Sequence, residues 1–252
     1  MQQDEQQHLK HITHEALQDM VHFDTKVLKT LPVLIFKPGK LTESSFHKKN
    51  DDYVKPLALF GFLNFLFFVI KFKGIFAYRL AGYQSQFAGR ISNAAAETHL
   101  SLPLLTERFN TAMHFEQKEY LVVMVPFFAL LVMLLGIMQR RHFVQHLVFS
   151  LHFYSFFIVF LMVLPYIMLL VRWVTSLLHG QTDFFETEYF LTGIILVVNF
   201  IYLLFAVRRF YRNNWLVSAI KSALLSYGVL LLIIYVFRLF LFFAVMHSIT
   251  GI

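Results

Sequence analysis

Five side chains of metal-ligand type stand at helical spacing near the start of the chain. His8, His11, Glu15, Asp19 and His22 are separated by three, four, four and three residues, which places them within about 80° of arc on a helix. Imidazole and carboxylate ligands one turn apart suit zinc, iron or manganese, and a second helix could complete such a site. The pattern predicts a divalent-metal site, although the same residue types also form the water-facing side of an amphipathic helix.

Four polar side chains lie within strongly apolar stretches of the sequence. His146 and His152 are six residues apart, a rotation of about 240° on a helix, so the two imidazoles cannot form a ligand pair on that helix alone. An ionisable side chain inside a membrane span is costly and is a candidate for a proton relay or a ligand contact. The alternative is a neutral His152 that is hydrogen-bonded across a helix bundle. Asn64 and Asn199 are expected to join helices through amide hydrogen bonds.

Motifs that define common enzyme classes are absent from the sequence. It contains no HExxH, no GxSxG, no Walker phosphate-binding loop and no GxGxxG, which are the patterns with a known catalytic or nucleotide-binding geometry. The chain also has no Cys, which excludes disulfides, thiolate zinc sites, iron–sulfur clusters and a Cys nucleophile. The sequence therefore favours a non-catalytic role. Any cofactor beyond a divalent metal stays unknown.

The composition is that of an integral membrane protein. Apolar residues make up 58% of the chain, Phe alone supplies 31 residues, and charged residues are only 15%, against about 25% in soluble proteins. The net charge of +7 comes mostly from Lys and Arg residues at the ends of apolar segments, where membrane topology and anionic lipid headgroups account for them. We therefore expect membrane lipids as partners and no binding of nucleic acid.

The apolar segments define the membrane-spanning helices. A hydrocarbon layer about 30 Å thick needs roughly 20 mainly apolar residues in a helix, and the sequence lacks the alternating pattern of a transmembrane barrel. The sequence therefore predicts an all-α, polytopic membrane protein with about five transmembrane helices, at residues 56–73, 120–138, 143–171, 190–207 and 216–246.

Positive charges in the short loops predict the orientation. Arg140 and Arg141 separate the second and third spans, and residues 208–212 follow the fourth span with three more arginines, so both loops are expected in the cytoplasm. The N-terminus then lies inside and the C-terminus outside. Three cations after the first span do not fit this arrangement: Lys71, Lys73 and Arg79.

Two arginines lie toward the external ends of spans on this topology. Arg172 belongs to the end of the third span and Arg238 to that of the fifth, where a long cationic side chain can reach lipid phosphate. If the two side chains face the interior together, they form an anion or lipid-headgroup site.

The remaining sequence divides into two extramembrane parts. Residues 1–55 are expected to form a cytoplasmic, membrane-proximal segment, in which residues 4 to about 30 read as an amphipathic helix that lies on lipid or on the bundle. Residues 56–252 are the transmembrane domain, with an extramembrane insertion at about residues 74–119 that is too long for a simple connector.

Three stretches resemble a bacterial membrane family known as domain of unknown function 3667. They are FKPGK at residues 36–40, YVKPL at residues 53–57, and QHLVFSLHFYSF at residues 145–156. The resemblance implies a polytopic fold in the bacterial inner membrane and implies no established activity. Longer members of the family begin with a four-Cys zinc ribbon, and this chain departs from them because it has no Cys.

Three functional hypotheses follow from these features. The first is a small multi-pass accessory or assembly subunit that binds lipid, a larger membrane complex or further copies of itself, with the N-terminal helix as a docking element. The second is a transporter or lipid-handling protein in which His152, Asn199 and Arg238 line a polar path. The third is a metal-dependent membrane enzyme that uses the N-terminal stripe from His8 to His22.

Overall fold

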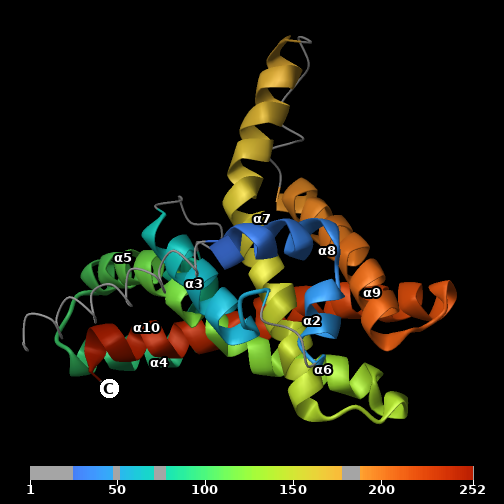
Figure 1. Cartoon of the computed structure of the whole chain (residues 1–252). Coiled ribbons are helices and arrows are strands. Elements are labelled where there is room, and N and C mark those ends of the chain that lie inside the picture. The colour runs from blue at the N-terminus through green and yellow to red at the C-terminus, as the bar shows by residue number, and fades with distance from the viewer. Residues whose placement is uncertain (1–24, 48–51, 71–77, 178–187, 252) are drawn as a thin grey trace, which may run out of the picture.

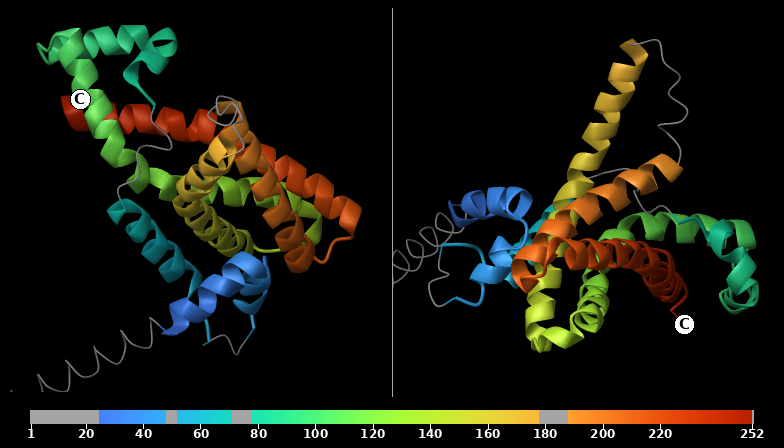
Figure 2. Two further views of the ribbon diagram at one scale, coloured as in Figure 1. Left: turned by 90° about the horizontal axis from the view of Figure 1, so that it is seen from above. Right: turned by 90° about the vertical axis from the view of Figure 1, so that its right-hand side faces the viewer.

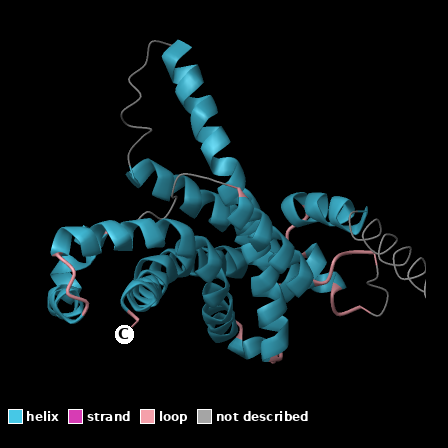
Figure 3. Cartoon of the chain, turned by 90° about the vertical axis from the view of Figure 1, so that its left-hand side faces the viewer, coloured by secondary structure: helices cyan, strands magenta, loops and turns pink. Residues whose placement is uncertain are grey.

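The computed structural model describes residues 25–47, 52–70, 78–177 and 188–251, and all regular structure in these ranges is helical (Figure 1, Figure 3). This confirms the predicted all-α class for the described ranges. Long apolar segments fold as helices because a helix pairs its own backbone donors and acceptors without help from solvent. The stripe of metal-ligand residues from His8 to His22 lies outside the described residues.

The helices follow one another in a single series. A helix over residues 25–36 comes first. The others are α2 Lys40–Ser44, α3 Pro56–Val69, η1 Leu80–Tyr83, α4 Gln84–Glu97, α5 Leu102–Glu119, η2 Tyr120–Val123, α6 Met124–Leu135, η3 Ile137–Gln139, α7 Phe143–Leu177, α8 Glu188–Tyr211, α9 Trp215–Leu231, η5 Leu232–Phe237 and α10 Arg238–Thr250. The segment η5 is π-helical, and it joins α9 and α10 into one continuous helix, Trp215–Thr250.

Three helices in the described residues are long and apolar enough to cross a membrane: Phe143–Leu177, Phe190–Tyr211 and Trp215–Thr250. They correspond to the last three of the five predicted spans. The first two predicted spans contain the shorter apolar helices Pro56–Val69 and Tyr120–Leu135. A helix of 14 residues such as α3 is about 21 Å long, which is less than the hydrocarbon thickness of about 30 Å.

The two short apolar helices end for local reasons. At the end of α3, Ile70 has extended backbone angles. After α6, Gly136 breaks the regular helix, and a side chain there would come within 3.0 Å of the imidazole of His146. The predicted spans run to residues 73 and 138, beyond the ends of the two helices at Val69 and Leu135.

Helix α7 is the centre of the packing. Helices α3 and α6 both pack against it, α8 packs against α9, and α10 packs against α5. Aromatic side chains fill the interior around the first half of α7, where the ring of Phe128 from α6 stacks on Phe153 at 4.6 Å between centroids and meets Tyr154 edge-on at 5.7 Å. The second half of α7 projects away from the rest of the molecule, as all three ribbon views show (Figure 1, Figure 2, Figure 3).

Residues 25–44 form a helical hairpin, called the N-terminal hairpin below. Its first helix ends before Pro38 because a proline disfavours helical angles at the residue before it, and Gly39 turns the chain with a φ of 78° before α2 begins. The short helix α2 packs against both α7 and α8. The hydroxyl of Thr30 accepts a hydrogen bond of 3.1 Å from the backbone N–H of Val54, which holds the hairpin to the segment that leads into α3.

Residues 80–119 form η1, α4 and α5 and lie beside the end of the longest helix. The hydroxyl of Tyr83 donates to the backbone carbonyl of Arg238 at 3.1 Å, and the Arg238 guanidinium donates to the carbonyl of Gly82. Burial raises the pKa of Tyr83, against a smaller opposite effect of the Arg238 charge, so the phenol stays a donor. The ring of Phe87 stacks on Phe242 at 4.4 Å. These contacts fix η1 and α4 against α10.

Candidate anion-binding site

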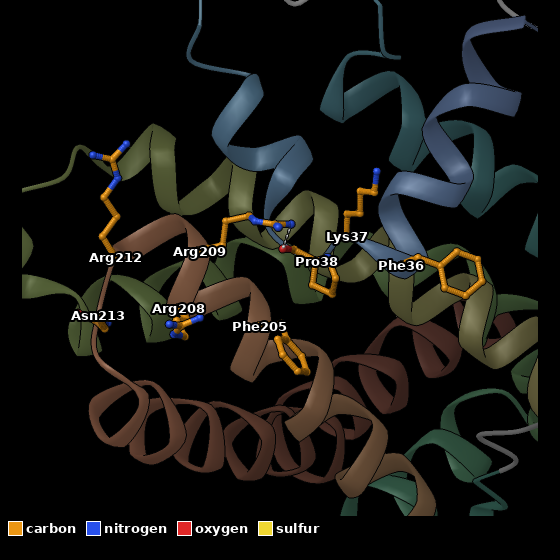
Figure 4. A pocket seen from close by; sticks show the side chains of 8 residues that line it. All are labelled: Phe36, Lys37, Pro38, Phe205, Arg208, Arg209, Arg212 and Asn213. Atoms are coloured by element: carbon orange, nitrogen blue, oxygen red, sulfur yellow. Dashed lines mark hydrogen bonds between the residues drawn. The ribbon is translucent and has the colours of Figure 1, made fainter.

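A hollow of about 500 Å³ opens between the turn of the N-terminal hairpin and the end of α8 (Figure 4). We call it the basic hollow, because the described residues of its lining include four cationic side chains and no carboxylate. The lining residues are Phe36, Lys37, Pro38, Phe205, Arg208, Arg209, Arg212 and Asn213.

Helical periodicity brings the arginines to one side of α8. Residues three and four apart share a helix face, so Phe205, Arg208 and Arg209 line one stretch of wall, and Arg212 follows directly after the helix ends at Tyr211. Cations in the last turn of a helix also interact favourably with the partial negative charge of its final carbonyls. Arg212 has a φ of 55° and leads the chain toward Asn214, whose side-chain oxygen caps α9 by accepting from the backbone N–H of Val217 at 2.9 Å.

Gly39 allows the opposite wall to approach the backbone of α8. A Cβ atom at this position would lie 2.8 Å from the carbonyl oxygen of Ala206, which is too close for any side chain. The positive φ of Gly39 is a further reason for glycine here. With the turn this close to α8, Arg209 donates to the carbonyl of Pro38 at 3.3 Å (Figure 4).

The described residues neutralise the cations of the hollow only weakly. Arg212 lies 3.7 Å from the carboxylate of Glu43, with side chains that are 79% and 37% exposed, and such surface pairs contribute little. Arg208 stacks over the ring of Trp215 at 3.9 Å, a contact that positions the guanidinium without cancelling its charge. Guanidinium groups can bind phosphate or carboxylate oxygens through two parallel hydrogen bonds. The arrangement therefore suits an anion.

The rim of the basic hollow is apolar. Phe36 is 78% exposed and Phe205 is 46% exposed. Both rings belong to elements that also carry lining cations, and they lie beside Pro38 in the close view (Figure 4). A ligand that combines an anionic group with an apolar chain would meet complementary surfaces on both parts.

Two buried histidines hold the elements beneath the hollow together. His152 is hydrogen-bonded through Nδ1 to the hydroxyl of Thr42 in α2 at 3.0 Å. His146 is hydrogen-bonded through Nδ1 to the hydroxyl of Tyr211 at the end of α8 at 2.6 Å. Next to it, Arg141 donates to the carbonyl of Phe210 at 2.7 Å and lies over that ring. Both imidazoles therefore join α7 to the two walls of the hollow.

Both amides selected from the sequence have buried polar atoms without a hydrogen-bond partner among the described residues. Asn199 in α8 is 1% exposed, and neither atom of its amide has a hydrogen-bond partner among the described residues. The side-chain oxygen of Asn64 in α3 is likewise buried and has no partner there.

The other predicted site residues lie away from the basic hollow. Arg172 is exposed on the projecting half of α7, and Arg238 contacts Gly82 and the ring of Tyr83. Within the described residues, no group of three or more His, Asp or Glu side chains is placed to hold a metal ion.

Sequence reasoning did not identify the basic hollow. It assigned the arginines of residues 208–212 to topology and used the FKPGK stretch for the family resemblance. One sequence feature could have indicated the hollow: the segment with Lys37 and the arginines of residues 208–212 were both predicted on the cytoplasmic side of the membrane. The prediction still lacked the contact between Gly39 and Ala206 that brings the two segments together.

Comparison with known proteins gives one finding. The family model described as "Protein of unknown function (DUF3667)" matches residues 24–68. No curated protein and no solved structure matches the chain. The matched range contains the N-terminal hairpin, the Gly39 turn and most of α3. The resemblance noted from the sequence is thus supported over the segment that forms one wall of the basic hollow, and the family's description assigns no activity to it.

Proposed function

We propose that this chain is a multi-pass membrane protein with a binding or assembly role, and that the basic hollow holds the anionic headgroup of a membrane lipid. The observation that carries this proposal is a lining of four cations without a carboxylate. A phosphate group there would replace the water that otherwise solvates Lys37, Arg208 and Arg209. Charge-assisted hydrogen bonds to phosphate are roughly twice as strong as neutral ones.

A lipid is favoured over a soluble anion because of the apolar rim. The exposed rings of Phe36 and Phe205 would be unfavourable in water and favourable against an acyl chain. A free phosphate would use only the cationic half of the surface.

The proposed membrane placement follows from the apolar helices and the loop charges. The three long helices would cross the bilayer, and the shorter α3 and α6 would be embedded beside them to complete five apolar segments. The loops with Arg140, Arg141 and residues 208–212 would face the cytoplasm, with the N-terminus inside and the C-terminus outside. The bacterial family resemblance favours the inner membrane as the location. The basic hollow would then meet the cytoplasmic leaflet, which attracts cationic segments through its anionic lipids.

Lipid titration tests the proposal. The delipidated protein in mild detergent would be titrated with phosphatidylglycerol and observed by native mass spectrometry, beside the Arg208→Gln/Arg209→Gln variant and the Lys37→Gln variant. Loss of two charge-assisted contacts should weaken phosphatidylglycerol binding about tenfold or more. A matched control is Lys29→Gln/Arg108→Gln, which removes two exposed cations outside the hollow.

Two outcomes would overturn the assignment. One is equal loss of lipid in the control and in the Arg208→Gln/Arg209→Gln variant. The other is binding of inorganic phosphate as tight as that of the lipid, which would assign the hollow to a soluble anion.

The assembly role has its own test. Purification in nanodiscs followed by mass spectrometry of everything that co-elutes should reveal a stoichiometric protein partner or a defined oligomer. A homogeneous monomer that carries only lipid would remove the assembly role and leave the lipid-binding role. Elemental analysis of the same sample examines the metal site predicted at His8 to His22.

A further inference from the structure

A second hollow, of about 370 Å³, lies between α4 and α10. The long helix Trp215–Thr250 begins near the basic hollow and ends at this second hollow. We call it the α4–α10 groove. It is lined by Arg90, Asn93, Ala94, Glu97, Phe242, Phe243, Met246, His247 and Thr250. Unlike the basic hollow, its lining carries charges of both signs.

The opposite charges stand at fixed positions on one face of α4. Arg90 and Glu97 are seven residues apart, which is two helical turns or about 10.5 Å along the axis. Between them lies Ala94, which is buried against the rest of the protein. Its small side chain leaves space between the two longer ones. Within the described residues, no ion pair joins Arg90 to Glu97, so each charge remains available to a ligand.

The floor of the α4–α10 groove is apolar and held in place by ring contacts. Phe242 is buried and stacks on Phe87. Phe243 is partly exposed and lies 4.9 Å below the guanidinium of Arg90. This cation–π contact positions the guanidinium at the edge of the groove, above an aromatic surface.

We propose that the α4–α10 groove binds the zwitterionic headgroup of a phospholipid that carries a primary amine. The phosphate would accept hydrogen bonds from Arg90, the ammonium would donate to Glu97, and the start of an acyl chain would cover Phe243 and Met246. A ligand with separated positive and negative groups matches this lining, whereas an anionic lipid would place its only charge near Arg90 and leave Glu97 without a partner. This site is separate from the basic hollow, so the proposal does not depend on the function proposed for that hollow.

Charge-removing variants separate the two contacts. The full chain carrying Arg208→Gln/Arg209→Gln, which weakens lipid binding in the basic hollow, would be delipidated and titrated with phosphatidylethanolamine and with phosphatidylglycerol under native mass spectrometry. Glu97→Gln should weaken phosphatidylethanolamine binding about tenfold, because the ammonium contact is lost. It should not weaken phosphatidylglycerol binding, because that lipid has no ammonium group and the Glu97 carboxylate repels its phosphate. Arg90→Gln should weaken the binding of both lipids, because both use their phosphate there.

Matched controls come from the neighbouring helix. Glu107→Gln and Arg108→Gln remove exposed charges of α5 that do not line the groove, and they should leave both affinities unchanged. Circular dichroism confirms that each variant keeps its helix content. Equal effects of Glu97→Gln and Glu107→Gln on phosphatidylethanolamine would overturn the proposal. Binding of soluble glycerophosphoethanolamine as tight as that of the lipid would also overturn it, because the site would then take a free phosphoamine.

Discussion

The two halves of α7 have a similar apolar composition and opposite surroundings. Residues 146–161 are mostly buried, and their buried polar side chains include His146, Ser150, His152 and Ser155. Residues 162–177 project from the molecule, and large apolar side chains such as Leu169 are exposed there. In water the large apolar side chains of the projecting half would be unfavourable. The arrangement is expected where lipid, and not water, surrounds the protein.

The serines and histidines of the buried half each have a hydrogen-bond partner. Ser150 donates to the carbonyl of His146 at 2.9 Å, and Ser155 donates to the carbonyl of Leu151 at 2.7 Å. The two imidazoles bond to the hydroxyls of Thr42 and Tyr211. Satisfied polar groups can be buried at little cost, whereas unpaired ones are expensive. The buried half is therefore specific for its neighbours, and the exposed half requires only an apolar environment.

Leucine truncation in each half gives the largest expected difference. Leu161→Ala removes a fully buried side chain and should lower the free energy of unfolding by about 2–5 kcal/mol, as cavity-forming substitutions do. Leu169→Ala removes a side chain that is 63% exposed and should change it by less than about 0.5 kcal/mol. Denaturant unfolding in detergent measures both. Similar losses for the two variants would show that the projecting half is packed against something in solution.

Gly39→Ala tests the hairpin that packs against the buried half. Alanine at a left-handed position is disfavoured by about 1–2 kcal/mol, and its Cβ would also press on the carbonyl of Ala206. We expect a loss of about 2 kcal/mol or more in unfolding free energy, together with weaker lipid binding in the basic hollow. Gly61→Ala is the control, since a Cβ atom at Gly61 would have nothing within 4 Å and alanine favours helix by about 0.5–1 kcal/mol. Equal stability of the two variants would contradict the close approach.

Thr42→Val removes the hydroxyl that bonds to His152 and keeps the side-chain shape. Because the imidazole then lies buried with an unpaired nitrogen, the unfolding free energy should fall by about 1–3 kcal/mol. Thr106→Val is the matched control, since that exposed hydroxyl bonds only to a carbonyl of its own helix. A loss no larger than that of the control would mean that the Thr42–His152 bond does not stabilise the protein.

Tyr211→Phe should have an effect similar to that of Thr42→Val. The substitution keeps the ring, which stacks against His146, and removes only the hydroxyl of the 2.6 Å hydrogen bond. Because His146 is buried and its Nδ1 atom then has no hydroxyl partner, we expect a loss of about 1–3 kcal/mol, as for Thr42→Val. Tyr227→Phe, at an exposed position of α9, should change nothing measurable. The same denaturant assay compares the two.

The long helices were predictable from sequence because apolar runs in lipid have few alternatives to a helix. The predicted segment 143–171 lies within α7, Phe143–Leu177, and the predicted segment 216–246 lies within Trp215–Thr250. The ends of α3 and α6, at Val69 and Leu135, were predicted too late, at residues 73 and 138, because a span of roughly 20 residues was expected from the hydrocarbon thickness. Those ends depend on backbone angles.

The basic hollow was not predictable because it depends on long-range contact. Arg209 and the carbonyl of Pro38 are 171 residues apart in sequence. Sequence periodicity gives the face of α8 that carries the arginines. It contains no information on which turn meets that face. The α4–α10 groove was not predictable for the same reason, because the contact between Arg90 and Phe243 joins residues that are far apart in the sequence.

The π-helical segment η5 has a consequence for insertions and deletions in the longest helix. A π-helical turn holds an extra residue compared with an α-helical turn. The segment η5 therefore contains more residues than a regular α-helix of the same length would need. Loss of one residue within Leu232–Phe237 could convert the segment to regular α-helix and leave the contacts of α10 with α5 in register. The same loss within α9 would rotate every following side chain by about 100°. Length variation in this helix should therefore be tolerated at η5 and not elsewhere, which unfolding measurements on the two single-residue deletions would decide.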